Sequence, residues 1–270
     1  MNLKTPQLSI IIPTWNTADI TLNCINSIQK YLPKTFFEII VIDNASADNT
    51  SDLFSKNKNI IYVRNSENLG FSKACNIGVK YAKSDYLLFL NSDMELVDSS
   101  IVDMLSFFQK NSNCGLVGPQ FLNPDKSVQG SVFPPQTSLN AFREFWLNQK
   151  SYSKYFPAGD NPLSVWAISG GAVLIKKELF EKIGGWNEKY FMYYEDLDLC
   201  RQIRKSNLKI YYYPKCKLIH RHGASGANLA NSDNQWRRLI PSSILYHGYF
   251  NHKLINFIIW SGQKIKTTGN

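Results

Sequence analysis

Hydrophobic residues in the first third of the chain follow two alternating patterns. Short unbroken apolar runs, each as long as a strand buried on both faces, occur at residues 8–14, 36–42, 60–63 and 86–90. Segments with apolar residues at every third or fourth position, typical of amphipathic helices, lie between them at residues 17–32, 48–56 and 71–82. Strands that alternate with helices predict right-handed βαβ units and a parallel sheet, so residues 1–95 are expected to form a nucleotide-binding half-domain.

The pattern is looser after residue 95. Residues 119–165 carry six prolines among aromatic residues and are predicted to be irregular. Because long irregular segments in compact domains often serve binding, we expect the acceptor site there. The remaining regular elements are predicted as helices near residues 98–108, 178–183 and 195–205 and as strands at 114–117, 168–175, 209–213 and 217–219.

Polar side chains follow the predicted strands, at the edge of a parallel sheet where ligands bind. Asn91 and Asp93 end the strand at 86–90, and on an extended chain their side chains point the same way. Their oxygens suit a hard divalent cation, which in turn can hold phosphate oxygens. His220, after the last strand, can supply an imidazole ligand to the same ion, and its neighbour His222 leaves the choice of histidine open. The alternative is that these polar residues only turn the chain and cap the next helix.

Two further acidic positions are candidates for chemistry. Asp43 ends the strand at 36–42 and can accept a hydrogen bond from a pyrimidine N–H, or it can simply cap the following helix. Glu195 and Asp196 open a helix just after an aromatic run, where one of them can act as a general base. Acidic residues in a first helical turn also complement the helix dipole, which by itself would explain both.

Composition narrows the classes of function. The chain has 270 residues with a formal net charge of +9, which favours an anionic partner such as a nucleotide, a nucleic acid or a membrane surface. No G-x-G-x-x-G follows the first strand and no G-x-x-x-x-G-K-[ST] occurs, which argues against a dinucleotide site and a P-loop. The five cysteines are widely spaced without a C-x-x-C pair, so neither a disulfide framework nor a zinc site is expected.

The chain ends suggest where the protein works. The first residues lack a signal-peptide pattern, and no apolar run approaches the ~20 residues of a membrane span, so a cytoplasmic protein is expected. Residues 234–270 contain no acidic residue but carry basic and aromatic residues, and we expect an amphipathic helical extension there. It either lies on an anionic bilayer, at the inner face of the cell membrane, or docks on the domain with its lysines in water.

Taken in order, the motifs of the chain resemble those of family 2 glycosyltransferases with the GT-A fold, over nearly all of residues 7–225. The subgroup most similar is that of bacterial rhamnosyltransferase-like enzymes of polysaccharide assembly. The matching segments are 10–16 (IIIPTWN), 41–46 (VIDNAS), 68–71 (NLGF), 76–78 (NIG), 90–93 (LNSD), 170–172 (GGA), 185–186 (GW), 194–199 (YEDLDL) and 220–225 (HRHGAS).

The resemblance implies a role for each matching residue. Asp196 would be the general base with Glu195 beside it, and Gly171 and Trp186 would border the sugar and acceptor. Asp93 stands in the family's D-x-D motif and would bind Mg²⁺ or Mn²⁺ together with Asn91 and His220. The residues implied to contact the nucleotide are Pro13, Thr14, Asn16, Asp43, Asn44, Asn68, Gly70, Lys73, Asn91, Ser92 and Asp93.

One position departs from the family pattern. Asn91 replaces the first aspartate of D-x-D, and a neutral amide holds a divalent ion more weakly than a carboxylate does. The departure weakens the expectation of tight metal binding.

The sequence therefore predicts an α/β protein with a mostly parallel sheet flanked by helices. Residues 1–233 would form the catalytic domain, with a nucleotide half at 1–95 and an acceptor half at 96–233, followed by the extension at 234–270. The predicted activity is inverting transfer of a sugar from a nucleotide-sugar donor, dTDP-rhamnose or a UDP-sugar, to a saccharide or lipid-linked saccharide acceptor. This requires Asp93 and Asp196 to meet in one cleft.

Two alternatives come from other classes. A catalytically silent nucleotide- or carbohydrate-binding module of the same fold would keep Asp43 and Asp93 but need no base. A nucleic-acid-binding protein is suggested only by the net charge, because the basic residues form no known reading motif; no nucleic-acid partner is expected.

Overall fold

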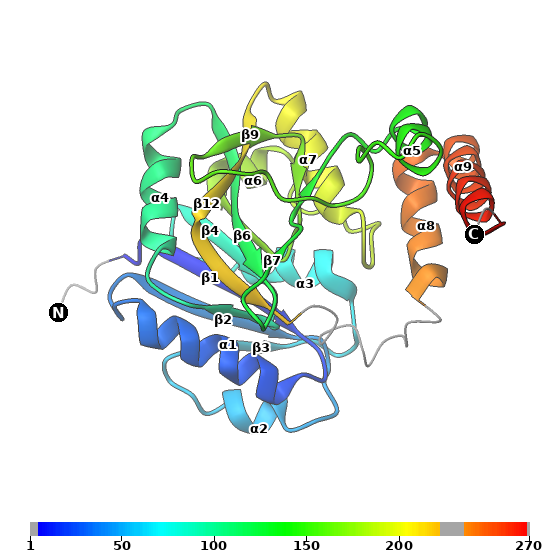
Figure 1. Ribbon diagram of the computed structural model, residues 1–270. Coiled ribbons are helices and arrows are strands. Elements are labelled where there is room, and N and C mark those ends of the chain that lie inside the picture. The colour runs from blue at the N-terminus through cyan, green and yellow to red at the C-terminus, as the bar shows by residue number, and fades with distance from the viewer. Residues whose placement is uncertain (1–4, 222–234, 269–270) are drawn as a thin grey trace.

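The computed structural model describes residues 5–221 and 235–268, and one mixed sheet forms its centre (Figure 1). The strand order is β3–β2–β1–β4–β11–β6–β12–β5. The first half of the sheet consists of β1 (Leu8–Thr14), β2 (Phe37–Asp43), β3 (Ile61–Arg64) and β4 (Tyr86–Leu90). These four strands pair in parallel, which confirms the prediction for this part of the chain.

The second half of the sheet is mixed. Its main strands are β5 (Met94–Leu96), β6 (Cys114–Leu122), β11 (Ala172–Lys176) and β12 (Lys209–His220). β11 runs antiparallel between β4 and β6, whereas β12 runs parallel to β6. The short strands β7 (Val128–Gln129) and β9 (Leu163–Val165) pair with β6 and β12, and β8 (Val132–Phe133) pairs with β10 (Ala167–Ile168) in a separate ribbon.

Two strand predictions in this half need correction. The strand expected at residues 168–175 is divided into β10 and β11, because residues 169–171 leave the sheet and reach the pocket described below. The strands expected at 209–213 and 217–219 are one strand, β12, whose register shifts between Tyr213 and Lys217. Such an irregularity bends a strand without ending it.

Helices cover both faces of the sheet. They are α1 (Ala18–Tyr31), α2 (Thr50–Phe54), α3 (Gly70–Val79), α4 (Ile101–Lys110), α6 (Lys177–Lys182) and α7 (Glu195–Lys205). Alternate residues of β1 enter different cores: Ile10 and Ile12 pack with α1 and α4, and Ile11 packs with α3 and α7. Both faces of the strand are thus buried, which explains its unbroken apolarity.

Three helices gather at one side of the molecule, away from α2 (Figure 1). They are α5 (Ser138–Phe145), α8 (Gln235–His247) and α9 (Tyr249–Thr268). α5 lies in the segment expected to be irregular, and its N-cap Thr137 accepts a hydrogen bond from the Asn140 N–H at 3.2 Å. The C-terminal segment is helical as expected, and among the described residues no helix is both long and apolar enough to cross a bilayer.

Candidate active site

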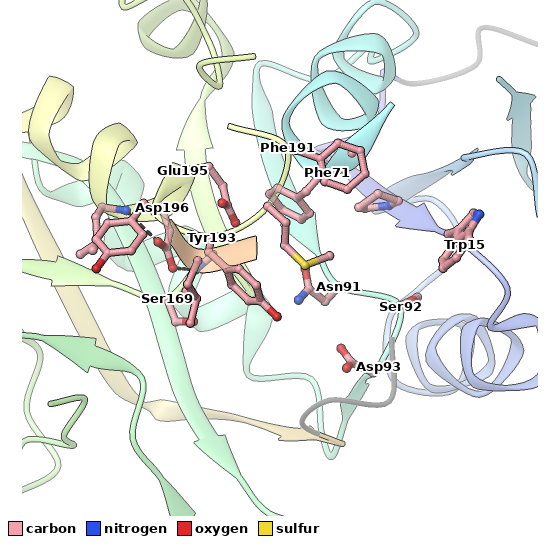
Figure 2. Close-up of a pocket in the computed structure, with 18 of the residues that line it drawn as sticks. Trp15, Phe71, Asn91, Ser92, Asp93, Ser169, Phe191, Tyr193, Glu195 and Asp196 are labelled. Atoms are coloured by element: carbon pink, nitrogen blue, oxygen red, sulfur yellow. Dashed lines mark hydrogen bonds between the residues drawn. The ribbon is translucent and has the colours of Figure 1, made fainter. Parts of the chain in front are cut away.

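The carboxyl ends of β1 and β4 open into a pocket of about 410 Å³. Figure 2 shows Ser92 and Asp93 on one side of this pocket and Ser169 and Asp196 on the other, with Asn91 and Tyr193 between them. The expected convergence of Asp93 and Asp196 is therefore observed. The residues that were predicted from sequence and line the pocket are Pro13, Thr14, Asn44, Asn68, Gly70, Asn91, Ser92, Asp93, Gly171, Glu195, Asp196 and His220.

The donor set at the end of β4 suits a divalent cation. Asp93 is 1% exposed, and its Oδ1 lies 3.5 Å from Nε2 of His220. The His220 Nδ1 lies 2.6 Å from Oε1 of Gln129, an acceptor, while Nε2 faces Asp93. The Asn91 Oδ1 is buried and has no hydrogen-bond partner within the described part of the chain. All three side chains line the pocket. The carboxylate and amide oxygens are ligands of the kind that Mg²⁺ and Mn²⁺ bind, and the imidazole nitrogen is a further ligand suited to Mn²⁺.

The acidic pair at the start of α7 forms the opposite wall. Asp196 Oδ2 accepts a hydrogen bond from the Gly170 N–H at 3.1 Å, and Oδ1 accepts one from the Leu197 N–H at 2.8 Å. The Glu195 side chain is buried, and its Oε2 has no hydrogen-bond partner among residues 5–221 and 235–268.

The two acids hold their protons differently because their surroundings differ. Burial and the adjacent Asp196 raise the pKa of Glu195 to about 8. Burial also raises the pKa of Asp196, but the charge of Lys154 and the two backbone N–H donors oppose that rise. Glu195 therefore binds its proton more tightly than Asp196, whose donors favour a negative charge.

The backbone just before the acidic pair is strained. Tyr193 and Tyr194 have φ values of 71° and 67°, in the left-handed region, which costs on the order of 1 kcal/mol for each residue. The Ser242 hydroxyl on α8 donates to the Met192 carbonyl at 2.8 Å, and the Tyr194 ring packs on Tyr246 with centroids 5.4 Å apart. α8 thus holds the segment that aims Glu195 and Asp196 into the pocket.

Several residues that line the pocket were not among the predicted site residues. They are Trp15, Phe71, Phe133, Gln136, Lys154, Ser169, Gly170, Phe191, Met192, Tyr193, Tyr194, Leu197 and Leu239. Lys154 Nζ donates to the Ser169 hydroxyl at 3.3 Å and lies 4.8 Å from the Phe133 ring centre. Lys154, Phe133 and Gln136 all come from the proline-rich segment where the acceptor site was expected.

One partly buried carboxylate, that of Glu144, orders the loop that carries Lys154. Glu144 on α5 accepts hydrogen bonds from the backbone N–H groups of Ser151, Tyr152 and Ser153 at 2.8, 2.6 and 3.0 Å. Partial burial works to raise the pKa of Glu144, but these bonds and that of the Ser153 hydroxyl lower it to about 2. The loop therefore has a charged anchor at neutral pH.

Four predicted residues do not line the pocket: Asn16, Asp43, Lys73 and Trp186. Trp186 is 1% exposed and packs edge-on against Phe71 and Phe89, in the core behind Gly170 rather than at the sugar. Lys73 is exposed on α3. The Asn16 Oδ1 accepts the Ala47 N–H at 2.7 Å.

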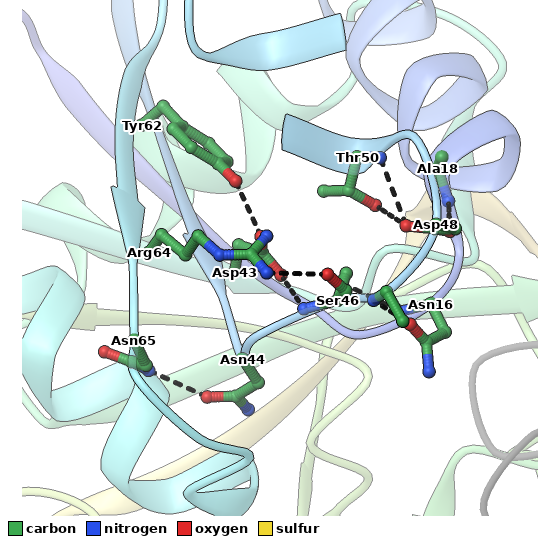
Figure 3. Close-up of polar contacts among 11 residues, drawn as sticks. Asn16, Ala18, Asp43, Asn44, Ser46, Asp48, Thr50, Tyr62, Arg64 and Asn65 are labelled. Carbon is green, nitrogen blue, oxygen red and sulfur yellow. Dashed lines mark hydrogen bonds and ion pairs between the residues drawn. The ribbon is translucent and has the colours of Figure 1, made fainter. Parts of the chain in front are cut away.

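Asp43 is fully buried beside the pocket residue Asn44. Its carboxylate accepts hydrogen bonds from the Ser46 N–H at 2.8 Å, the Tyr62 hydroxyl at 2.6 Å and the Arg64 guanidinium at 2.8 Å (Figure 3). Its assignment to the nucleotide base stays a prediction. His222, the other histidine considered as a metal ligand, lies outside the described residues.

Two protein-family models match the chain over the strands and helices that form the pocket. The model of the family described as Glycosyl transferase family 2 matches residues 9–184, from β1 to the end of α6. The chain belongs to glycosyltransferase family 2. A second family model, described as the N-terminal domain of galactosyltransferase, matches residues 150–223, which include Lys154 and the acidic pair.

Curated relatives of this family 2 chain include two named as rhamnosyltransferases. It is 23% identical to the dTDP-rhamnosyl transferase RfbF of Shigella flexneri, over 79% of the chain and 68% of RfbF. It is 24% identical to the N-acetylglucosaminyl-diphospho-decaprenol L-rhamnosyltransferase of Mycobacterium tuberculosis, over 67% of the chain and 66% of that protein. These relatives support the rhamnosyltransferase-like subgroup. The chain is also 26% identical to the O-antigen biosynthesis protein RfbC of Myxococcus xanthus, over 82% of the chain but only 18% of the length of RfbC.

Solved structures confirm the GT-A fold. GalNAc-T7, solved with UDP, GalNAc and Mn²⁺, superposes with a TM-score of 0.64 at 17% identity, over 79% of this chain and 43% of that one. Residues 1–349 of Staphylococcus aureus TarS superpose with a TM-score of 0.57 at 17% identity, over 90% of this chain and 72% of that one.

Proposed function

We propose that this protein is an inverting glycosyltransferase that moves a sugar from a nucleoside-diphosphate donor to a hydroxyl group of a saccharide or lipid-linked saccharide during surface polysaccharide synthesis. The observation that carries the proposal is the common pocket of Asp93 and Asp196. One carboxylate belongs to a donor set suited to a diphosphate-bound cation, and the other is a charged, buried base on the opposite wall.

The donor would lie along the carboxyl ends of β1 and β4. Pro13, Thr14, Asn44, Asn68 and Gly70 line this side and are the proposed nucleotide contacts, with Asp43 as the proposed reader of the base behind them. The donor is dTDP-rhamnose, by likeness to RfbF, or a UDP-sugar, by likeness to GalNAc-T7.

A divalent ion fits the donor side. Asp93, Asn91 and His220 are the residues that would hold Mg²⁺ or Mn²⁺. When bound, the ion would neutralise negative charge on the departing diphosphate.

The acceptor would enter beside α7. Its hydroxyl oxygen attacks the anomeric carbon, the carbon–oxygen bond to the diphosphate breaks with its electron pair, and the hydroxyl proton passes to Asp196. The Gly170 and Leu197 N–H groups hold the Asp196 carboxylate in place for this step. Neutral Glu195 places no second negative charge beside it. A single displacement inverts the anomeric centre.

A donor screen followed by a transfer assay tests the proposal. We expect one nucleotide sugar among dTDP-, UDP- and GDP-sugars to raise the thermal midpoint of the protein, and more so with Mn²⁺, because ligands stabilise the native state that binds them. Asp93→Asn should lose the metal-dependent part of the shift, whereas Asp160→Asn, an exposed site outside the pocket, should keep it.

The transfer assay then separates an enzyme from a binding module. With the selected donor and a saccharide acceptor, the product should carry the inverted anomeric configuration by NMR. Donor binding with neither transfer nor slow donor hydrolysis would point to a catalytically silent module instead, and a retained configuration would contradict the mechanism.

A further inference from the structure

The outer face of α9 exposes an arc of large apolar side chains. We call this set the α9 arc; its members are Phe250, Leu254, Phe257, Trp260 and Ile265. Phe250 is 87% exposed and Phe257 is 60% exposed. At 100° per residue these positions fall on one side of the helix.

The opposite side of α9 is packed against the protein. His252 and Ile255 are buried there, and Gly262 touches α5 so closely that a Cβ would lie 2.7 Å from the Phe145 carbonyl oxygen. The Trp146 indole N–H donates to the Ile258 carbonyl at 3.1 Å. α9 is therefore fixed in orientation, and the helix lies at the edge of the molecule (Figure 1).

Lysines interrupt the arc, and no acid does. Lys253 and Lys264 are exposed on the same side, and their Nζ atoms lie 5.6 Å from the Tyr249 ring and 4.6 Å from the Trp260 ring. α9 contains no aspartate or glutamate. Apolar and aromatic side chains with lysines between them match the boundary between lipid headgroups and acyl chains.

We propose that the α9 arc is a contact surface for an anionic phospholipid bilayer. Phe250, Leu254 and Phe257 would enter the boundary region, while Lys253 and Lys264 would reach the headgroup phosphates. A second copy of the chain is a poorer occupant: a two-fold interface brings the same surface against itself, so lysines would meet lysines, and the helix offers no carboxylate to pair with them.

The arc is connected to the pocket through α8. Leu239 of α8 lines the pocket, and α8 continues from there for about 12 Å, at 1.5 Å per residue, to its end at His247, after which α9 begins at Tyr249. Bilayer contact would therefore hold the pocket near the headgroups, where a lipid-linked acceptor is presented. This consequence for the acceptor rests on the proposed function, whereas the bilayer contact itself does not.

Vesicle flotation in the absence of any sugar substrate tests the contact. The full chain should float with vesicles of phosphatidylcholine mixed with phosphatidylglycerol, and much less with phosphatidylcholine alone. Phe250→Ser combined with Phe257→Ser should lower partitioning roughly tenfold or more. Lys253→Gln and Lys264→Gln should each lower it about fivefold on anionic vesicles and leave neutral vesicles unaffected.

Exposed aromatics elsewhere provide the matched control. Tyr81→Ser with Phe156→Ser removes two exposed rings outside α9 and should float like the wild type. Unchanged thermal midpoints establish that each variant is folded. Wild type that stays below anionic vesicles, or serine variants that float equally well, would overturn the proposal. So would a wild-type dimer that the serine changes convert to monomers, because a second copy would then occupy the arc.

Discussion

Asp43 and the Glu195–Asp196 pair are both buried carboxylate sites, yet they are built in opposite ways. Asp43 receives a backbone N–H, a phenol and a guanidinium, so its charge is matched on both oxygens. The acidic pair receives two backbone N–H groups, both on Asp196, and Glu195 Oε2 is buried without a hydrogen-bond partner in the described part of the chain. A carboxylate with donors on both oxygens is held in one position, whereas an undersupplied pair is suited to exchange a proton.

The backbone conformation also differs between these two sites. Asp43 ends a regular strand, in register with Thr14 of β1. Glu195 and Asp196 follow two tyrosines in left-handed conformations that neighbouring elements hold in place. A single left-handed residue, Ala45 with a φ of 61°, follows Asp43 by two positions, whereas two consecutive ones directly precede the site to which we assign proton transfer. Strained backbone tends to occur at functional sites.

Removing the base should have the largest effect. Asp196→Asn should lower the rate of sugar transfer about 10³-fold, because the hydroxyl proton loses its acceptor. Donor binding by thermal shift should change little. The unfolding midpoint should fall modestly, because the amide has one acceptor oxygen and keeps only one of the two backbone hydrogen bonds. Equal transfer rates for wild type and variant would remove Asp196 from its role.

Replacing Asp43, whose carboxylate has hydrogen-bond donors on both oxygens, should lower the stability of the protein. Asp43→Asn weakens charged hydrogen bonds to Tyr62 and the Ser46 N–H and should lower the free energy of unfolding by about 2 kcal/mol in a denaturant titration. Asp52→Asn, exposed on α2, is the matched control and should be neutral. An intact fold with a raised KM for the donor and an unchanged kcat would instead favour the predicted contact of Asp43 with the base.

The pH dependence should distinguish Glu195 from Asp196. The folded protein holds the Glu195 proton to about pH 8, while the unfolded chain releases it near its ordinary value of 4.5. Between these values the folded state binds more protons, so the free energy of unfolding should fall as pH rises. Glu195→Gln should flatten that decrease in denaturant titrations.

The pH dependence of sugar transfer should also depend on the ionisation of Glu195. In the wild type, kcat/KM should fall above about pH 8 as Glu195 ionises beside Asp196, and Glu195→Gln should remove this alkaline fall while retaining activity at neutral pH. An alkaline limb that persists in the glutamine variant would assign it to another group.

The smallest effect is expected when the hydrogen bond between Ser242 of α8 and the Met192 carbonyl is removed. Ser242→Ala removes the hydrogen bond to the Met192 carbonyl, worth about 1 kcal/mol, and should lower kcat roughly fivefold with little change in donor KM. Ser261→Ala on α9 removes a comparable hydroxyl bond, to the Phe257 carbonyl, far from the pocket. If both alanine variants have wild-type kcat, α8 does not help to maintain the strained segment.

Much of the fold was predictable because buried strands have a recognisable sequence pattern. β1, β2 and β4 are buried on both faces, so their apolar runs are unbroken and their ends are marked by polar residues that reach the pocket, as at Asn91 and Asp93. α7 was also located correctly, since its acidic first turn and apolar spacing agree.

The parts that were missed depend on contacts between distant segments. α5 is short, exposes Leu139 and Phe142, and is secured mainly by α9. Lys154 reaches the pocket only because Glu144 orders its loop. Trp186 belongs to a segment that matches the family, but its ring is buried in the core behind Gly170. A sequence motif does not show whether a side chain points into the core or into the pocket.

The antiparallel strand β11 has a consequence for how the protein is made. It closes the free edge of β4, but it is translated long after β4, once α4, β6 and the whole proline-rich segment have left the ribosome. Until then the four N-terminal strands present an apolar edge with unpaired backbone groups, a surface prone to aggregation. The nascent chain should therefore depend on chaperones most strongly in this interval, and the arrival of residues 172–176 should be the step that ends it.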